Sequence, residues 1–323
     1  MLAMMLPLKN EFDPAPIESF VAVLTCPACD ASGARPIGRP APGWDIEVVD
    51  RVFRHPNYDV KYCASCGVYF KSRVFSEQAL AEYYRLLPFE SFESSELFPT
   101  DRLVLSAIAA VEAGAKVLDF GCGVGRVLER LTARHRCYGV EVNERAREIA
   151  KAKGITVVPE SSVRSRTERD FDFIILSDVF EHVAKPLQLL RILTDVLKPG
   201  GSLIISTGNG DAVRCREFIS HFWYFRAPGH LHMLSPKHLR WCAAGLGLDL
   251  NEYTLTSHYA TPFLPKCRQH VAAWAFEQFH LRPRSWSTQL LRVLPKIRRA
   301  ENWPLAPAIT CTPDHLVAVL RKP

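Results

Sequence analysis

Short apolar runs alternate with helical patterns along the chain between about Asp101 and Thr207. This alternation is typical of a parallel β-sheet whose strands are joined by helices that cover the sheet. We therefore predict an α/β fold with helices on both faces of the sheet. The strands predicted in this part are Lys116 to Phe120, Cys137 to Val142, Ile155 to Pro159, Phe171 to Leu176 and Ser202 to Ser206.

Two helices are predicted between these strands, because apolar residues recur there at helical spacing. The second begins at Pro186 and ends at the turn Lys198-Pro199-Gly200-Gly201, since proline suits the first turn of a helix and glycine its end. The first follows the strand that ends at Phe120, and its apolar positions are Val124, Val127, Leu128 and Leu131.

The C-terminal third continues the same sheet and interrupts it once. A helix is predicted from Ser235-Pro236 to Gly245, followed by a sixth strand near Leu248 to Leu255. The last apolar run, His315 to Leu320, is expected to complete the sheet. Residues 258–308 are basic, helical in pattern and punctuated by proline, so we interpret them as an insertion.

The N-terminal part is predicted to be a small module. Residues 31–57 are rich in proline, glycine and arginine, which favour turns and short strands. From Ser76 the pattern becomes that of a capped amphipathic helix ended by Pro88. We therefore divide the chain into an N-terminal module (1–75), a linker helix (76–100) and a large C-terminal domain (101–323). The apolar face of the linker helix comprises Leu80, Tyr83, Tyr84 and Leu87.

The composition is that of a globular protein, with 48% hydrophobic and 23% charged residues in 323. The apolar start, Met1 to Leu8, lacks a basic cluster, so we expect no signal peptide. No stretch approaches the roughly 20 apolar residues needed to span a bilayer. We therefore expect a cytoplasmic protein with no integral membrane segment.

The formal net charge of +6 is unevenly placed. Cations crowd into one C-terminal stretch, namely Lys266, Arg268, Arg282, Arg284, Arg292, Lys296, Arg298 and Arg299. A solvated helical surface explains such a stretch, and so does contact with an anionic partner. One such partner is a membrane surface, against which the stretch would lay Trp286, Leu290, Leu291, Leu294 and Trp303.

The strongest single feature is a glycine turn after the first predicted strand, in Val117-Leu-Asp-Phe-Gly-Cys-Gly-Val-Gly125. Glycines allow the backbone to turn sharply and to approach a ligand closely. Glu141 ends the next strand, where a carboxylate can accept hydrogen bonds from both ribose hydroxyls of an adenosine. Arg126 stands where a dinucleotide site would carry its third glycine, which disfavours NAD and FAD.

Four segments, in this order, resemble the class I methyltransferases: Asp119-Phe-Gly-Cys-Gly-Val-Gly125, Glu141, Phe180-Glu-His-Val183 and Leu197-Lys-Pro-Gly-Gly201. The resemblance covers roughly residues 100–255 and the last strand. It implies a Rossmann-like sheet of seven strands with the last one antiparallel. It also implies S-adenosylmethionine as the cofactor.

The same resemblance implies roles for individual residues. Glu141 would hold the ribose, and Ser177 and Asp178 would border the cofactor after the fourth strand. The adenine contact is left open, because Glu160-Ser161-Ser162 offers no acid in a clear register. The methionine end would be held by Asp119, Gly121, Cys122, Gly123 and Gly125.

Two Cys-x-x-Cys pairs stand on either side of the proline-rich segment, Cys26 with Cys29 and Cys63 with Cys66. Each pair can direct two thiolates at one ion, and two pairs complete a tetrahedral zinc site. Four thiolates leave no open position, so we expect a structural zinc ribbon. Redox-active or merely buried cysteines are the alternative. The surrounding sequence resembles the N-terminal module of methyltransferases that act on sugars and other small metabolites.

Two histidines are candidates for the base that removes a proton from the methyl acceptor. His182 follows the fourth predicted strand and His230 follows the fifth, so both should face the acceptor side of the cleft. The aromatics Phe222 to Phe225 are candidates for a cover over the acceptor. The sugar C-methyltransferases that the chain resembles have Tyr-x-Glu-His where this sequence reads Ala227-Pro228-Gly229-His230, which leaves O- or N-methylation open.

The sequence therefore predicts a methyltransferase that acts on a small-molecule or glycan acceptor. One alternative is an RNA-modifying methyltransferase that uses the zinc ribbon and the basic stretch for phosphate contacts. The other is a binding protein that keeps the cofactor fold without catalysis.

Overall fold

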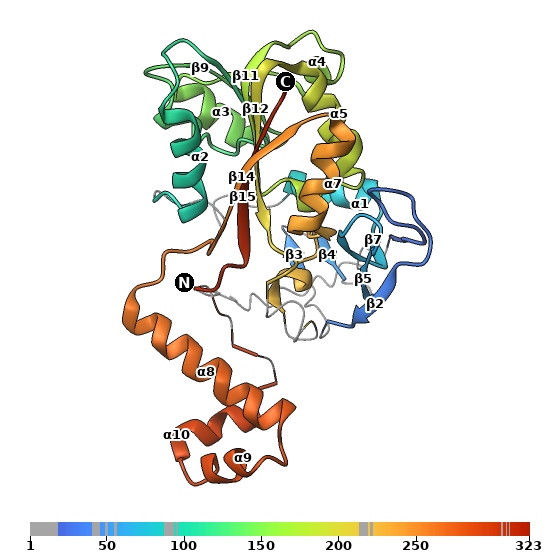
Figure 1. The fold of residues 1–323 in the computed structure, drawn as a ribbon, viewed down its shortest axis with the longest axis vertical. Coiled ribbons are helices and arrows are strands. Elements are labelled where there is room, and N and C mark those ends of the chain that lie inside the picture. Colours follow the sequence, from blue (N-terminus) through green and yellow to red (C-terminus); the bar gives the residue numbers. More distant parts are fainter. Residues whose placement is uncertain are drawn as a thin grey trace.

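The computed structural model describes residues 19–40, 46–48, 51–54, 57–86, 94, 96–212, 219, 222–304, 306–307, 309 and 311–323. Its main body is a seven-stranded sheet with the strand order β10-β9-β8-β11-β12-β15-β14 (Figure 1). The strands are β8 (Lys116–Phe120), β9 (Arg136–Val140), β10 (Thr156–Val157), β11 (Phe171–Ser177), β12 (Leu197–Gly208), β14 (Asp249–Thr256) and β15 (His315–Arg321).

The last strand gives the sheet its mixed character. β15 lies between β12 and β14 and runs antiparallel to both, whereas the pairs formed by β8 to β12 are parallel. The predicted Rossmann-like sheet with an antiparallel last strand is therefore confirmed. Because β15 is reversed, its first residue, His315, lies opposite Gly208 at the end of β12.

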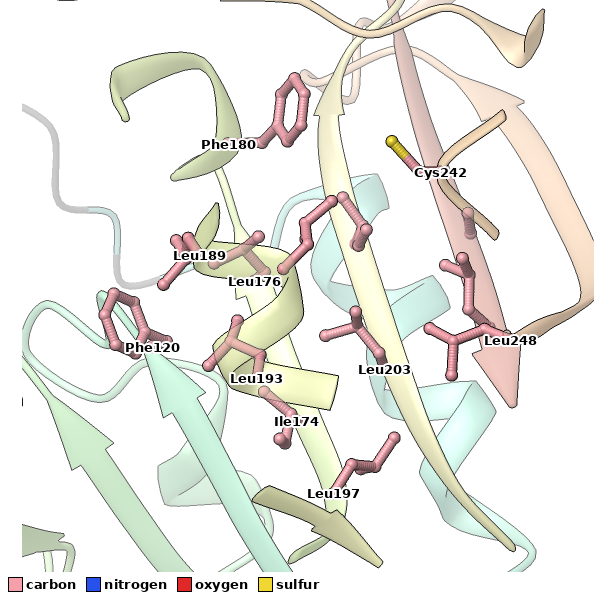
Figure 2. Packing of buried hydrophobic residues seen from close by; sticks show 14 of the residues in the cluster. Phe120, Ile174, Leu176, Phe180, Leu189, Leu193, Leu197, Leu203, Cys242 and Leu248 are labelled. Atoms are coloured by element: carbon pink, nitrogen blue, oxygen red, sulfur yellow. The ribbon is translucent and has the colours of Figure 1, made fainter. Parts of the chain in front are cut away.

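Both faces of the sheet are covered by helices, as predicted. On one face α5 (Pro186–Val196) and α7 (Pro236–Leu246) enclose the larger core, which Figure 2 shows around Leu176, Leu193 and Leu203. On the other face α2 (Pro99–Ala109) and α3 (Glu144–Ala152) cover a second core. The short α4 (Glu160–Arg164) precedes β11.

The predicted helix after the glycine turn is wrong. The segment forms turns and one short 3-10 helix, η2 (Leu128–Arg130). Its backbone N–H groups bond three or four residues back, as in Gly125 to Cys122 and Thr132 to Leu128. Such mixed turns bury the same positions as a helix, so the apolar spacing did not distinguish the two.

The N-terminal part forms short antiparallel strands and one helix, α1 (Glu77–Leu86). A four-stranded sheet has the order β13-β6-β5-β2, and its outer strand β13 comes from the C-terminal part of the chain. Leu87 and Pro88, the predicted end of α1, lie outside the described residues, and the division at residues 75 and 100 stays a prediction. The strands are β1 (Phe20–Ala22), β2 (Arg35–Gly38), β3 (Ile46–Val48), β4 (Arg51–Phe53), β5 (Val60–Tyr62), β6 (Tyr69–Lys71), β7 (Arg73–Phe75) and β13 (His232–Met233).

The second cysteine turn also docks on the start of α7. Ser235 Oγ donates to the carbonyl of Gly67 at 2.7 Å, and His238 Nδ1 lies 3.1 Å from the carbonyl of Cys66. Gly67 has φ +84°, and a Cβ there would lie 2.8 Å from Lys237 Cγ and 3.0 Å from the His238 backbone nitrogen. Glycine is therefore required both for the turn and for the contact.

The basic insertion forms a helical arm that projects away from the sheet (Figure 1). We use "the arm" for residues 263–302, which contain α8 (Phe263–Leu281), α9 (Trp286–Leu291), α10 (Pro295–Arg298) and η6 (Arg299–Asn302). Leu291 and Trp303, two of the five predicted membrane-facing residues, pack into the arm's own small core instead. Within the described residues, no helix is long and apolar enough to cross a bilayer.

Replacing Gly67 with alanine should lower the free energy of unfolding by about 1–2 kcal/mol for the left-handed backbone and by about 1–3 kcal/mol more for the collision with α7. Gly33→Ala is the matched control, because Gly33 has φ +82° but nothing lies within 4 Å of an added Cβ. Urea unfolding measures both variants. Equal losses would show that a side chain at position 67 does not collide with α7.

Candidate active site

The residues predicted to bind a cofactor gather at one edge of the sheet. Asp119 lies in β8, Glu141 follows β9, Ser177 ends β11 and Asp178 comes next. In open parallel sheets this carboxyl edge is where ligands bind. The fold therefore brings these four side chains, which are spread over 60 positions of sequence, to one place.

The glycine turn has a backbone that only glycine adopts easily. Gly121, Gly123 and Gly125 have φ of +88°, +53° and +77°. A Cβ at Gly121 would lie 2.4 Å from Val179 Cγ2, and one at Gly125 would lie 2.2 Å from Ile155 Cδ1. The turn can thus pack this closely against its neighbours because these positions have no side chain.

Cys122, predicted to contact the cofactor, has its side chain in the core. Its sulfur lies against Gly139, where an added Cβ would come within 2.5 Å of it, and the residue is 7% exposed. Only the backbone of Cys122 is left to face a ligand in the turn.

Glu141 ties the glycine turn to the next helix. Its Oε2 accepts from the backbone N–H of Gly123 at 2.9 Å, and its Oε1 accepts from that of Asn143 at 2.7 Å. A carboxylate has about four lone-pair positions, so each oxygen keeps capacity for a further donor such as a hydroxyl group.

Asp119 is buried beside other acids. Its Oδ1 and the hydroxyl of Ser177 have no hydrogen-bond partner within the described structure. Burial, with a smaller contribution from Asp101, raises the pKa of Asp119 to about 7, although Arg126 opposes the shift. Arg126 Nε pairs with Asp101 Oδ2 at 2.8 Å. A buried carboxylate without a donor suits a cationic or hydrogen-bonding ligand.

Sequence reasoning missed a second acid and histidine cluster at this edge. His258 and His315 each bring a ring nitrogen to 3.9 Å from a carboxylate oxygen of Asp178. The pKa of His315 is raised overall. Burial alone would lower it, but the hydrogen bond to Asp314 and the charge of Asp178 have the larger combined effect. Burial and the neighbouring His315 lower the pKa of His258 to about 3. Both histidines come from the ends of strands adjacent only in the folded sheet.

The two predicted catalytic histidines lie side by side, with ring centroids 4.9 Å apart. His182 ends η3 (Phe180–His182), and His230 follows η5 (Trp223–Arg226). Nδ1 of His182 is 2.9 Å from the carbonyl oxygen of Gly229, and Nδ1 of His230 is 2.8 Å from that of Tyr224. Because a carbonyl only accepts, we assign the ring proton of His230 to Nδ1. Nε2 of His230 then carries a lone pair.

His230 stays neutral at neutral pH. Burial lowers its pKa well below the ordinary value, and the neighbouring His182 and Lys71 lower it further. A neutral imidazole with Nδ1 held by a carbonyl is the form that accepts a proton at Nε2.

Tyr84 joins this pair from α1, a contact that sequence reasoning missed. Its hydroxyl lies 2.5 Å from Nδ1 of His182. A Cβ at Gly229 would come within 2.1 Å of the same hydroxyl oxygen. Tyr84 therefore fills the space that a side chain at position 229 would need, which explains the glycine before His230.

The predicted aromatic cover is part of the core instead. Phe222, Tyr224 and Phe225 are buried with Tyr58 of the N-terminal part, and the Trp223 side chain lies outside the described residues. Glu181 is 1% exposed. Its Oε1 accepts from the Tyr224 hydroxyl at 2.7 Å and its Oε2 from that of Thr207 at 2.8 Å. These hydroxyls, rather than His182, hold the carboxylate.

The four paired cysteines converge. Their sulfurs all lie within 4.8 Å of one another, with 3.5 Å between Cys26 and Cys66 and 3.6 Å between Cys29 and Cys63. None of the four is in a disulfide bond. Each pair bends in a tight turn, closed by Asp30 N–H to Cys26 and by Gly67 N–H to Cys63.

Comparison with known proteins agrees with the fold. Residues 92–253 match the family described as methyltransferase domain. The chain is 24% identical over 189 residues to a ubiquinone biosynthesis O-methyltransferase of Leptothrix cholodnii, which covers 49% of this chain and 80% of that protein. It is 26% identical over 189 residues to the protein of the same name from Methylococcus capsulatus, covering 50% and 79%.

A match of higher identity is shorter. The ubiquinone biosynthesis O-methyltransferase of Xanthomonas oryzae is 32% identical over 108 residues, which is 30% of this chain and 44% of that protein. The solved magnesium protoporphyrin IX methyltransferase of Synechocystis, with bound SAH, superposes with a TM-score of 0.50 at 12% identity and covers 77% of this chain and all of that one. At this identity the likeness shows the fold alone.

The Asp119→Asn variant should gain stability over the wild type as the pH rises from about 4 to about 7, and the gain should stay constant above that. In this window the folded wild type holds a proton on Asp119 that the unfolded chain has lost, so its stability falls with rising pH. Asparagine does not ionise. Urea unfolding without added ligand across this range measures the difference.

Asp249→Asn, at an exposed carboxylate, is the control for that experiment. If the difference in free energy of unfolding between Asp119→Asn and the wild type were the same at pH 4 and pH 7, the raised pKa of Asp119 would be contradicted.

Proposed function

The chain belongs to the methyltransferase domain family, and on this premise we propose that it methylates a hydroxyl group of a small-molecule or glycan acceptor. It is an S-adenosylmethionine-dependent methyltransferase by family and fold. Oxygen is favoured as the acceptor atom because several similar proteins are named O-methyltransferases. The observation that carries the proposal is the histidine pair, in which Nε2 of His230 carries a lone pair.

The sheet edge suits S-adenosylmethionine, which when bound supplies an electrophilic methyl group on a sulfonium. Asp119 and the backbone of the glycine turn would hold the amino-acid end, since the unpartnered Oδ1 of Asp119 can accept from an ammonium group. Glu141 keeps lone pairs for the ribose hydroxyls. Ser177 and Asp178 would border the cofactor at the end of β11.

The work of the chain's own residues is to place the acceptor hydroxyl and to remove its proton. We assign the proton to Nε2 of His230, which is neutral because burial keeps its pKa low. His182 lies beside it, fixed by Gly229 and Tyr84. Nδ1 of His230 keeps its proton and its hydrogen bond to the Tyr224 carbonyl, so the ring keeps its orientation through the transfer.

His230→Ala and His182→Ala should each lower kcat at least tenfold, about 1.4 kcal/mol of barrier, because a general base contributes about 10²–10⁴-fold. The assay follows S-adenosylhomocysteine over a panel of sugar nucleotides and phenols. Acidic phenols should lose less than aliphatic alcohols, because they ionise without help.

His270→Ala, at an exposed position on the arm, is the control. Donor binding by calorimetry checks that the variants fold. If neither histidine variant slows turnover tenfold with any acceptor that the wild type methylates, the assignment of the base is wrong.

The proposal includes a structural zinc ion held by Cys26, Cys29, Cys63 and Cys66. Zinc–sulfur bonds of about 2.3 Å in a tetrahedron place the sulfurs roughly 3.8 Å apart. The sulfur–sulfur distances of 3.5 Å between Cys26 and Cys66 and 3.6 Å between Cys29 and Cys63 are close to this value. Four thiolates leave no open position, so this ion would stabilise the N-terminal part and its docking on α7.

Purified protein should contain one zinc ion per chain by elemental analysis, and Cys26→Ser or Cys63→Ser should abolish it. Unfolding of these variants should begin at lower temperature, because the binding free energy of the ion is lost. Cys267→Ser, at an exposed cysteine of the arm, should retain both zinc and stability. The site would be refuted if the purified wild type contained no zinc, or if chelation left its melting temperature unchanged.

A further inference from the structure

We propose that the arm docks on the surface of an anionic lipid bilayer. The first observation is where the charge of the protein lies. The arm holds eight of the chain's 40 lysines and arginines and two of its 34 acids, Glu277 and Glu301. The positive and negative charges in the rest of the chain therefore cancel, and the whole formal net charge of +6 belongs to the 40 residues of the arm.

The second observation is apolar exposure on the same segment. Of fifteen large apolar side chains that are exposed in the described part of the chain, nine lie on the arm. Trp286 is 77% exposed and Val293 is 74% exposed, both near the tip. Along α8 a further stripe repeats at helical spacing and comprises Leu264, Val271, Trp274 and Leu281. Such residues among cations are typical of helices that lie in a membrane interface.

The third observation is a hollow beside the exposed tip. It has a volume of about 540 Å³, and three of its lining residues are Arg292, Arg298 and Arg299. Arg292 pairs with Glu301 at 2.8 Å, and Arg298 lies 4.0 Å from the same residue. The single carboxylate of Glu301 thus lies near two guanidinium groups. The hollow therefore keeps a net positive charge, which suits a lipid phosphate.

Charge and apolar surface together favour a bilayer over two other occupants. A second copy of the arm would bring two surfaces of +6 together, and they would repel. An RNA would match the cations but would leave aliphatic side chains such as Leu290 and Val293 in water. A bilayer of anionic lipid satisfies both features at once.

Flotation of the full-length protein with vesicles tests the proposal. The protein should float with vesicles of equal parts phosphatidylglycerol and phosphatidylcholine, and salt should release it, because surface attraction is screened within a Debye length. Pure phosphatidylcholine should retain at least tenfold less protein. Failure to float with either vesicle, or equal salt-independent flotation with both, would overturn the proposal.

Two sets of variants separate the charge from the apolar tip. Arg282→Glu with Arg284→Glu, and Trp286→Ser with Leu290→Ser and Val293→Ser, should each lower the bound fraction about tenfold. Arg85→Glu with Arg130→Glu is the charge control on exposed positions outside the arm, and Leu24→Ser is the apolar control at a residue that is 81% exposed. Arm variants that float like the wild type would contradict the proposal.

The same proteins distinguish the other occupants. Salt-sensitive binding to single-stranded RNA without flotation would replace the bilayer by a nucleic acid. A dimer in light scattering that the Trp286 set dissociates, again without flotation, would replace it by a second copy. Donor binding by calorimetry should be unchanged in all arm variants, so a negative result here leaves the methyltransferase proposal intact.

Discussion

The pairing of β13 with β6 is the interaction on which the arrangement of the site depends. β13 belongs to the segment after β12, yet it completes a sheet whose other strands are N-terminal. Next to it, the backbone of Leu231 accepts from Lys71 at 3.0 Å and donates to Glu181 at 2.7 Å. One residue therefore joins the N-terminal sheet to the segment that carries His182. Without this connection α1 would not place Tyr84 against the histidine pair.

Electrostatics at the sheet edge follow from burying several acids with few donors. Burial comes first and neighbouring carboxylates second in raising the pKa of both Asp119 and Asp178 to about 7. Arg126 and His315 oppose these shifts without cancelling them. Binding of a cationic ligand at this edge is favourable, because the ligand's charge reduces the repulsion between the buried carboxylates. The family's donor, a sulfonium, has that charge.

Much of the sheet could be predicted from sequence, because each strand and its turn is a local pattern. The strand Lys116 to Phe120 was predicted with its observed bounds, and glycines 121, 123 and 125 marked the turn. Tyr84, His258 and His315 could not be found this way, since their neighbours are distant in sequence. Phe222, Tyr224 and Phe225 were misread for the same reason: Tyr58, which packs with them, lies in another part of the chain.

The contact between Tyr84 and Gly229 has an evolutionary consequence. The hydroxyl of one residue occupies the place of the other's missing side chain. A glutamate at position 229, as in the Tyr-x-Glu-His motif of the sugar C-methyltransferases that the sequence resembles, would require the ring of Tyr84 to shift or a smaller residue to replace it. Substitutions at these two positions are therefore expected to co-vary among homologues.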